Sequence, residues 1–261
     1  MDILFFVVAF LSSIVGAICG IGGGVVIKPV LDMLQMGAPA TINFLSGCTV
    51  LSMSLYSVSK ALRAGDSKVE MSTGTPLALG AAVGGVVGKE MFSVVKSFFN
   101  GSPMVGGVQA VALGIITLGT LLYTINKSRI QTRTTSNKLV CLVIGLLLGI
   151  MSSFLGIGGG PINLVVLTFF FSMDTKTAAA NSLYIILFSQ MASFIATLIS
   201  GLPEFRVLGL VLMVAGGIGG GIVGRKLNKR MDNRAVDKLF IGLMVLIVGI
   251  CVYNAVRAFA G

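Results

Sequence analysis

The sequence predicts an all-α polytopic membrane protein. Of its 261 residues, 55% are hydrophobic and only 11% are charged, and the mean hydropathy is +1.00. A soluble domain carries roughly a quarter charged residues, so this chain lacks the polar surface of a water-soluble enzyme or DNA-binding protein. The net charge of +10 does not indicate a nucleic-acid partner, because the basic residues lie between long apolar stretches. That placement is typical of membrane topology, with the lipid bilayer as the surroundings.

Eight apolar segments account for most of the chain. A bilayer core of about 30 Å takes roughly 20 residues of helix, and each segment is at least that long. Their apolar runs are continuous rather than alternating, which favours helices over the strands of a barrel. The eight segments are 3–35, 40–62, 72–95, 105–126, 138–173, 177–200, 205–224 and 236–258.

The first and fifth segments are too long for one simple crossing, and each contains a glycine cluster. The letters GIGGG occur at Gly20–Gly24 and again at Gly156–Gly160. Each glycine costs about 1 kcal/mol relative to alanine inside a helix. Four glycines in five residues therefore predict that both helices are broken at these points, as re-entrant or discontinuous helices.

The two clusters belong to an internal repeat with an offset of 136 residues. The segment Gly80–Lys89 matches Gly216–Arg225 at the same offset as the two glycine clusters. We therefore predict an N-terminal repeat over 1–126, a polar linker over 127–137 and a C-terminal repeat over 138–261. Each repeat opens with a broken helix and continues with three spans.

The basic residues indicate how the repeats are oriented. If each broken segment enters and leaves on one side of the membrane, the second repeat is inverted, and one side collects fourteen basic residues against four on the other. These fourteen are Lys60, Arg63, Lys68, Lys127, Arg129, Arg133, Lys138, Lys176, Arg225, Lys226, Lys229, Arg230, Arg234 and Lys238. If each broken segment crosses once, the two sides are equal. The positive-inside rule favours the inverted arrangement, in the cell membrane with both termini outside.

Matched breaks in two inverted halves are typical of a transporter's binding site. Irregular backbone at membrane depth is tolerated only where it is buried in protein or lines a cavity. The short helix after each cluster starts with unpaired N–H groups and the positive end of its dipole, so two such ends can hold an anion. Pro161 suits the first position of the second short helix. The alternative is that the glycines only allow close helix packing.

Polar side chains near the breaks complete the predicted site. Lys28 lies in the first short helix, where its ammonium either completes the anion site or pairs with Asp32 one turn on. Other polar side chains follow the breaks and can bind an oxyanion or join helices. The predicted substrate-binding residues are Gly22, Gly23, Gly24, Lys28, Asn43, Ser46, Gly158, Gly159, Gly160, Asn181 and Ser182.

Two further patterns concern packing and chemistry. The ridges Gly80-x₃-Gly84-x₃-Gly88 and Gly216-x₃-Gly220-x₃-Gly224 predict close helix contacts within or between the halves. Histidine is absent, the four cysteines lack C-x-x-C spacing and no nucleophile–base set is visible. We therefore expect no metal, no other cofactor, no catalytic residues and no enzyme.

At these motifs the sequence resembles the TauE/SafE family of sulfite and organosulfonate exporters. Each half of a family member opens with G-x-G-G-G-x₄-P, and Gly20–Pro29 fits this motif fully. The second copy departs from it, since Val165 stands where the later proline is expected and Pro161 directly follows the glycines. The resemblance spans the whole chain, and it implies transport of small sulfur-containing anions across the cytoplasmic membrane, usually outward.

The sequence therefore predicts a secondary transporter that exports sulfite, thiosulfate or an organosulfonate by alternating access. Coupling to protons and formation of a homodimer are left open. The alternatives are a carrier of another small anion, of a cation or of a neutral metabolite, in which carbonyl groups replace N–H groups at the breaks. From a different class, a membrane-embedded enzyme or an assembly factor also remains an alternative.

Overall fold

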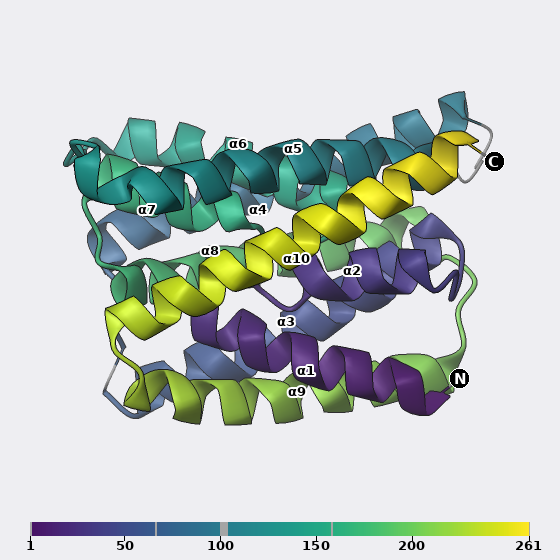
Figure 1. Ribbon diagram of the computed structural model, residues 1–261, viewed down its shortest axis with the longest axis horizontal. Coiled ribbons are helices and arrows are strands. Elements are labelled where there is room, and N and C mark those ends of the chain that lie inside the picture. Colours follow the sequence, from purple (N-terminus) through teal and green to yellow (C-terminus); the bar gives the residue numbers. More distant parts are fainter. Residues whose placement is uncertain (1, 66, 100–103, 158, 261) are drawn as a thin grey trace.

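The computed structural model describes residues 2–65, 67–99, 104–157 and 159–260, which form a bundle of long helices and contain no strand (Figure 1). The α-helices are α1 (Asp2–Cys19), α2 (Gly24–Met33), α3 (Pro39–Arg63), α4 (Met71–Phe98), α5 (Met104–Asn126), α6 (Lys138–Leu155), α7 (Pro161–Phe171), α8 (Thr175–Ser200), α9 (Val207–Arg230) and α10 (Asn233–Ala260). A single 3₁₀ turn, η1 (Lys127–Arg129), follows α5. The predicted all-α class is confirmed.

Eight of the described helices are long and apolar enough to cross a membrane. They are all the α-helices except α2 and α7, which have 10 and 11 residues. The first and fifth apolar segments are each divided into a helix of membrane-crossing length and a short helix. The division falls at the two glycine clusters, where the sequence predicts it.

The chain turns back on itself at each division. A Cβ placed on Gly16 would lie 2.5 Å from the backbone nitrogen of Gly23, so the start of α2 packs against the last turns of α1. After α7, the backbone N–H of Arg133 donates to the carbonyl of Phe169 at 2.7 Å, which holds the end of α7 beside the segment that leads into α6. Each short helix therefore returns toward the end of the bundle from which its long partner started (Figure 1).

Glycine ridges join the first and second halves of the chain. A Cβ on Gly80, Gly84 or Gly88 of α4 would overlap a backbone carbonyl of α6. In the same way, a Cβ on Gly216, Gly220 or Gly224 of α9 would meet a backbone carbonyl of α1. Both ridges thus let backbones approach directly, as small residues do at helix interfaces in lipid. The predicted packing role is confirmed, and the contact is between the halves in both cases.

Both chain termini lie at one end of the bundle, called the termini end (Figure 1). An ion pair of 3.3 Å joins Asp2 to Arg206, and Arg257 donates to the carbonyl of Met33 at 3.1 Å. The opposite end, called the basic end, carries the connections 64–70, 127–137, 172–174 and 231–232. The fourteen basic residues counted in the sequence lie on these connections or on the adjoining helix ends.

Candidate functional site

Both glycine breaks begin with a residue that only glycine suits. Gly20 has φ +72° and Gly156 has φ +65°, in the left-handed region that side chains with a Cβ rarely adopt. A Cβ on Gly20 would also overlap the backbone of Ala179, and one on Gly156 would overlap the Asn43 amide. Ala179 and Asn43 are themselves 136 residues apart. The first break therefore packs against the first turns of α8, and the second break packs against the first turns of α3. In each case the contact is with the long helix of the other half that comes after its short helix.

The two breaks also contact each other. A Cβ on Gly24 would overlap the carbonyl oxygen of Ile157, and one on Gly159 would lie 3.4 Å from the carbonyl oxygen of Ile21. Ile21 and Ile157 are fully buried, with 0% and 1% of their surface exposed. The centre of the bundle is therefore a crossing of two irregular backbone segments, which we call the glycine crossing and define as residues 20–24, 156–157 and 159–160.

Both short helices begin at this crossing. α2 starts at Gly24 and α7 starts at Pro161, as the sequence predicts. Neither helix has a side-chain hydrogen bond at its N-cap, which is Gly23 for α2 and Gly160 for α7. The first N–H groups of a helix need partners from outside it, so two uncapped helix N-termini start from the same buried region. Gly158, another predicted site residue, lies outside the described residues.

Polar side chains without hydrogen-bond partners surround the crossing. The Ser46 hydroxyl would lie 2.9 Å from a Cβ on Gly24, and the Ser13 hydroxyl 3.0 Å from a Cβ on Gly23. Among the described residues, neither hydroxyl finds a hydrogen-bond partner, and the same holds for the Asn43 amide and the Ser182 hydroxyl. Buried polar groups are normally hydrogen-bonded. Such a group of unsatisfied donors and acceptors is typical of a site that binds a polar ligand.

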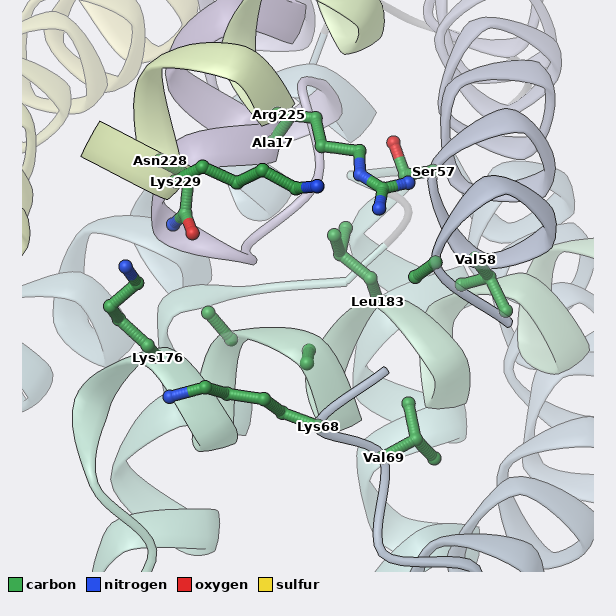
Figure 2. A pocket seen from close by; sticks show the side chains of 13 residues that line it. Ala17, Ser57, Val58, Lys68, Val69, Lys176, Leu183, Arg225, Asn228 and Lys229 are labelled. Atoms are coloured by element: carbon green, nitrogen blue, oxygen red, sulfur yellow. The ribbon is translucent and has the colours of Figure 1, made fainter. Parts of the chain in front are cut away.

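A cavity reaches the crossing from the basic end. It has a volume of about 420 Å³ and lies between α1, the C-terminal part of α3, the N-terminal part of α8 and the C-terminal part of α9. We call it the basic cavity, because Lys68, Lys176, Arg225 and Lys229 line it (Figure 2). Its lining includes Ala179, the residue on which the first break rests.

A second cavity reaches the crossing from the termini end. It has a volume of about 350 Å³ and lies between the N-terminal part of α3, α4, α6 and the C-terminal part of α8. We call it the hydroxyl cavity, because serine, threonine and amide side chains are frequent in its lining; Ser153, Asn43 and Gln190 are examples. Gly156, which begins the second break, lines it directly. Because α3 and α8 contribute opposite ends to the two cavities, the glycine crossing lies between them.

Lys28 and Asn181 have partners within the protein. The Lys28 ammonium lies 3.1 Å from the Asp32 carboxylate, one turn along α2, and only 3% of the lysine side chain is exposed. The Asn181 amide accepts a hydrogen bond from the N–H of Glu70 and donates to the carbonyls of Lys68 and Thr177. The ion pair matches one of the two interpretations of Lys28. Asn181 holds the connection before α4, and direct roles for both residues in binding stay predictions.

Sequence reasoning missed two parts of this region. Ser13 precedes the first break by seven residues, and only the reversal of the chain brings it beside Gly23. The pair Ser12–Ser13 inside an apolar helix is the signal that indicates it. The four basic residues of the basic cavity were interpreted as membrane topology alone, because their convergence from the 64–70 connection, α8 and α9 is not visible in the sequence.

The comparison with known proteins agrees with this architecture. The model of the sulfite exporter TauE/SafE family matches residues 5–250. The chain belongs to this family. Similar curated proteins of TauE/SafE type are named probable membrane transporters, so the chain is a multi-span membrane protein of a transporter family.

Two relatives of this TauE/SafE chain illustrate how distant the similarity is. The probable membrane transporter protein YunE of Bacillus subtilis is 23% identical over 279 residues, which cover 97% of this chain and 98% of the relative. A probable membrane transporter protein of Methanocaldococcus jannaschii is 24% identical over 203 residues, which cover 75% of this chain and 72% of the relative. No solved structure matches the chain significantly.

Proposed function

We propose that this chain is a secondary transporter that exports a small sulfur-containing oxyanion, of the sulfite, thiosulfate or organosulfonate class, by alternating access. One observation carries the proposal: two cavities approach from opposite ends of the bundle and are separated by a crossing of two glycine breaks. A carrier needs such a barrier, because its site is open to one side of the membrane at a time. Membership of the TauE/SafE family supports the substrate class.

We infer that the two halves are inverted repeats whose breaks are re-entrant. Contacts in the structure occur in pairs that support this: α4 packs against α6 and α8, while α9 packs against α1 and α3. With both termini outside, the basic end faces the cytoplasm. A membrane potential of 100 mV, negative inside, is then worth about 2.3 kcal/mol per charge for anion export.

The anion in this proposal binds at the glycine crossing. Backbone N–H groups of the two clusters and the dipoles of α2 and α7 supply positive potential without a permanent charge. The unsatisfied groups of Asn43, Ser46, Ser182 and Ser13 supply hydrogen bonds to its oxygens. Oxyanions accept several hydrogen bonds at once, so one ligand can satisfy donors on both halves.

Transport current in proteoliposomes tests the proposal. Purified protein would be adsorbed on a solid-supported membrane and exposed to sulfite, thiosulfate, sulfoacetate, taurine, sulfate and chloride, with and without a pH gradient. We expect a saturable current for at least one sulfur oxyanion and none for zwitterionic taurine. Protein-free liposomes are the control. A correctly folded protein that moves none of these anions, in current or in tracer counterflow, would contradict the proposal.

A further inference from the structure

The basic cavity has a more cationic lining than the hydroxyl cavity, which is lined by two lysines, Lys89 and Lys96. Four cationic side chains line the basic cavity, contributed by the 64–70 connection, α8 and α9 (Figure 2). None of the described residues that line it is acidic. Clefts lined by charges of one sign focus the electrostatic potential and raise the local concentration of the opposite ion. We therefore expect the basic cavity to concentrate anions.

Asp174 interacts electrostatically with Lys68, so this carboxylate offsets part of the charge of that lysine. The oxygens of Asp174 also cap α8. They accept hydrogen bonds from the backbone N–H groups of Lys176 and Thr177 and from the Thr177 hydroxyl. Lys176 donates from its ammonium to the carbonyl of Met231 at 2.9 Å, which fixes the side chain at the cavity and leaves its charge in place.

The part of the basic cavity toward the first glycine break is lined by apolar residues, unlike the part lined by the four basic residues. Ala17, Ala179 and Leu183 line it toward the first glycine break. At the same 136-residue offset, the hydroxyl cavity has Ser153, Asn43 and Gly47. An anion in the basic cavity is therefore held chiefly by the four cationic residues, and Ser57 and Asn228 are the uncharged polar residues of its lining.

We propose that the basic cavity is a separate oxyanion-binding site, which captures a multivalent oxyanion before it reaches the glycine crossing. This inference rests on the proposed function, because it assigns to the cavity the same class of anion that the carrier moves. The site would recognise its ligand by several cationic groups around a space of about 420 Å³. A free divalent sulfur oxyanion and an anionic phospholipid headgroup share that chemistry, so the test must separate these two sources.

Cysteine chemistry measures the potential in the cavity without relying on transport. Ala61 lines the basic cavity and Thr197, at the 136-residue offset, lines the hydroxyl cavity. The variants Ala61→Cys and Thr197→Cys would each be labelled with an anionic sulfonatoethyl and a cationic trimethylammonium methanethiosulfonate. The four native cysteines are buried, but Cys48 lines the hydroxyl cavity, so both variants would be made in a Cys48→Ala background. We expect the ratio of anionic to cationic labelling rates to be several-fold higher at position 61 than at position 197, because four cationic residues line the basic cavity and two, Lys89 and Lys96, line the hydroxyl cavity.

Neutralising the cavity wall should remove this preference. Lys68 and Lys229 are exposed, so we expect the double change Lys68→Gln/Lys229→Gln in the Ala61→Cys background to leave the protein folded, which its melting temperature checks. Lys226 and Arg230 lie on α9 but do not line the cavity, and Lys226→Gln/Arg230→Gln is the matched control. We expect the preference to fall several-fold in the first double variant and to change less in the second. Equal reactivity ratios at positions 61 and 197 would overturn the site.

The ligand of the basic cavity can be identified by testing which anion slows the labelling of Ala61→Cys. Thiosulfate should slow the labelling of Ala61→Cys in nanodiscs of phosphatidylcholine, at constant ionic strength, and the uncharged sugar trehalose should not. If phosphatidylglycerol protects the cysteine and thiosulfate does not, the cavity binds a lipid headgroup, and capture of a free oxyanion is overturned. No protection by either anion would overturn the proposal. If thiosulfate protects the cysteine but no sulfur oxyanion is transported, the site stands and the proposed function fails.

Discussion

Each cavity is lined by residues from both halves of the chain, and several lining positions correspond at the 136-residue offset, yet the two linings differ in kind. Arg225 in the basic cavity corresponds to Lys89 in the hydroxyl cavity, and Lys229 corresponds to Ser93. Four basic residues line the cavity on the cytoplasmic side of the proposed topology, whereas the other cavity has two, Lys89 and Lys96, and more hydroxyl and amide groups. The same fold thus provides a long-range attraction for anions at one end and short-range hydrogen bonds at the other. For an exporter, this difference favours capture from the cytoplasm.

The largest expected effect on transport comes from a bulky side chain placed between the two glycine breaks. In Gly24→Leu the new side chain would overlap the Ile157 carbonyl and crowd the Ser46 hydroxyl. Because its neighbour is backbone, no side-chain rotation relieves the overlap, and we expect transport from either cavity to be abolished. Proteoliposome flux measures this. Gly242→Leu is the control, since a Cβ on Gly242 meets nothing within 4 Å; normal flux in Gly24→Leu would contradict the role of the crossing.

Lys28 tests whether a buried charge belongs to either cavity. It lines neither of them, and its ammonium pairs with Asp32. Removing one partner of a buried ion pair costs about 3–5 kcal/mol, whereas apolar replacement of both is often neutral. We expect Lys28→Met to lower the melting temperature and the flux, and Lys28→Met/Asp32→Leu to recover both. A double variant that is stable but inactive would instead assign the ammonium to the anion site.

A change at Asn43 tests whether hydrogen bonds in the hydroxyl cavity contribute to anion binding. The Asn43 amide lines the hydroxyl cavity and has no partner among the described residues, whereas Ala179 takes the corresponding place in the basic cavity. A hydrogen bond to a charged group is worth about 1.5–3 kcal/mol, so Asn43→Ala should raise the KM for the anion by about tenfold or more.

Asn181→Ala is the comparison variant for Asn43. The Asn181 amide is used within the protein, so its loss should lower thermal stability and leave the KM near that of the native protein. A raised KM in Asn181→Ala at native stability would indicate that this residue contacts the anion after all.

The smallest expected effect concerns Asp174 near the mouth of the basic cavity. Partial burial raises the pKa of its carboxyl, but hydrogen bonds from Thr177 and Lys176 and the charge of Lys68 outweigh this, so the pKa lies below its usual 3.8. The cap therefore stabilises the protein above that pH, and the stabilisation is lost as the pH falls through the lowered pKa.

A cap of this kind is worth about 1 kcal/mol. Asp174→Ala should lower the melting temperature slightly at pH 7, and the difference from the native protein should disappear in acid. The measurement is thermal unfolding in detergent between pH 7 and pH 3. A difference that stays constant over this range would show that the carboxylate is not the source of the stabilisation.

The sequence was sufficient for the all-α class, the membrane-crossing helices and the two helix breaks, but only for part of the site. The glycine clusters located both helix breaks, because four glycines in five residues together strongly disfavour a helix. The 80–88 and 216–224 ridges located close packing for a different reason, since glycines four residues apart lie on one face of a helix and let another backbone approach. What the sequence lacked was the contact of Ser13 with Gly23 and the convergence of three segments on the basic cavity. Both depend on contacts between residues far apart in the chain, which periodicity does not encode.

The central claim is that the glycine crossing separates two cavities that open in turn. Ser57 and Ser193 are matched positions, one in each cavity, and serine to cysteine changes little in size. Ser57→Cys and Ser193→Cys would be labelled with a membrane-impermeant maleimide in proteoliposomes, from each side, with and without a saturating transported anion. We predict that the anion changes the two labelling rates in opposite directions. Rates that rise or fall together, or that do not respond to an anion that is demonstrably transported, would contradict alternating access at this crossing.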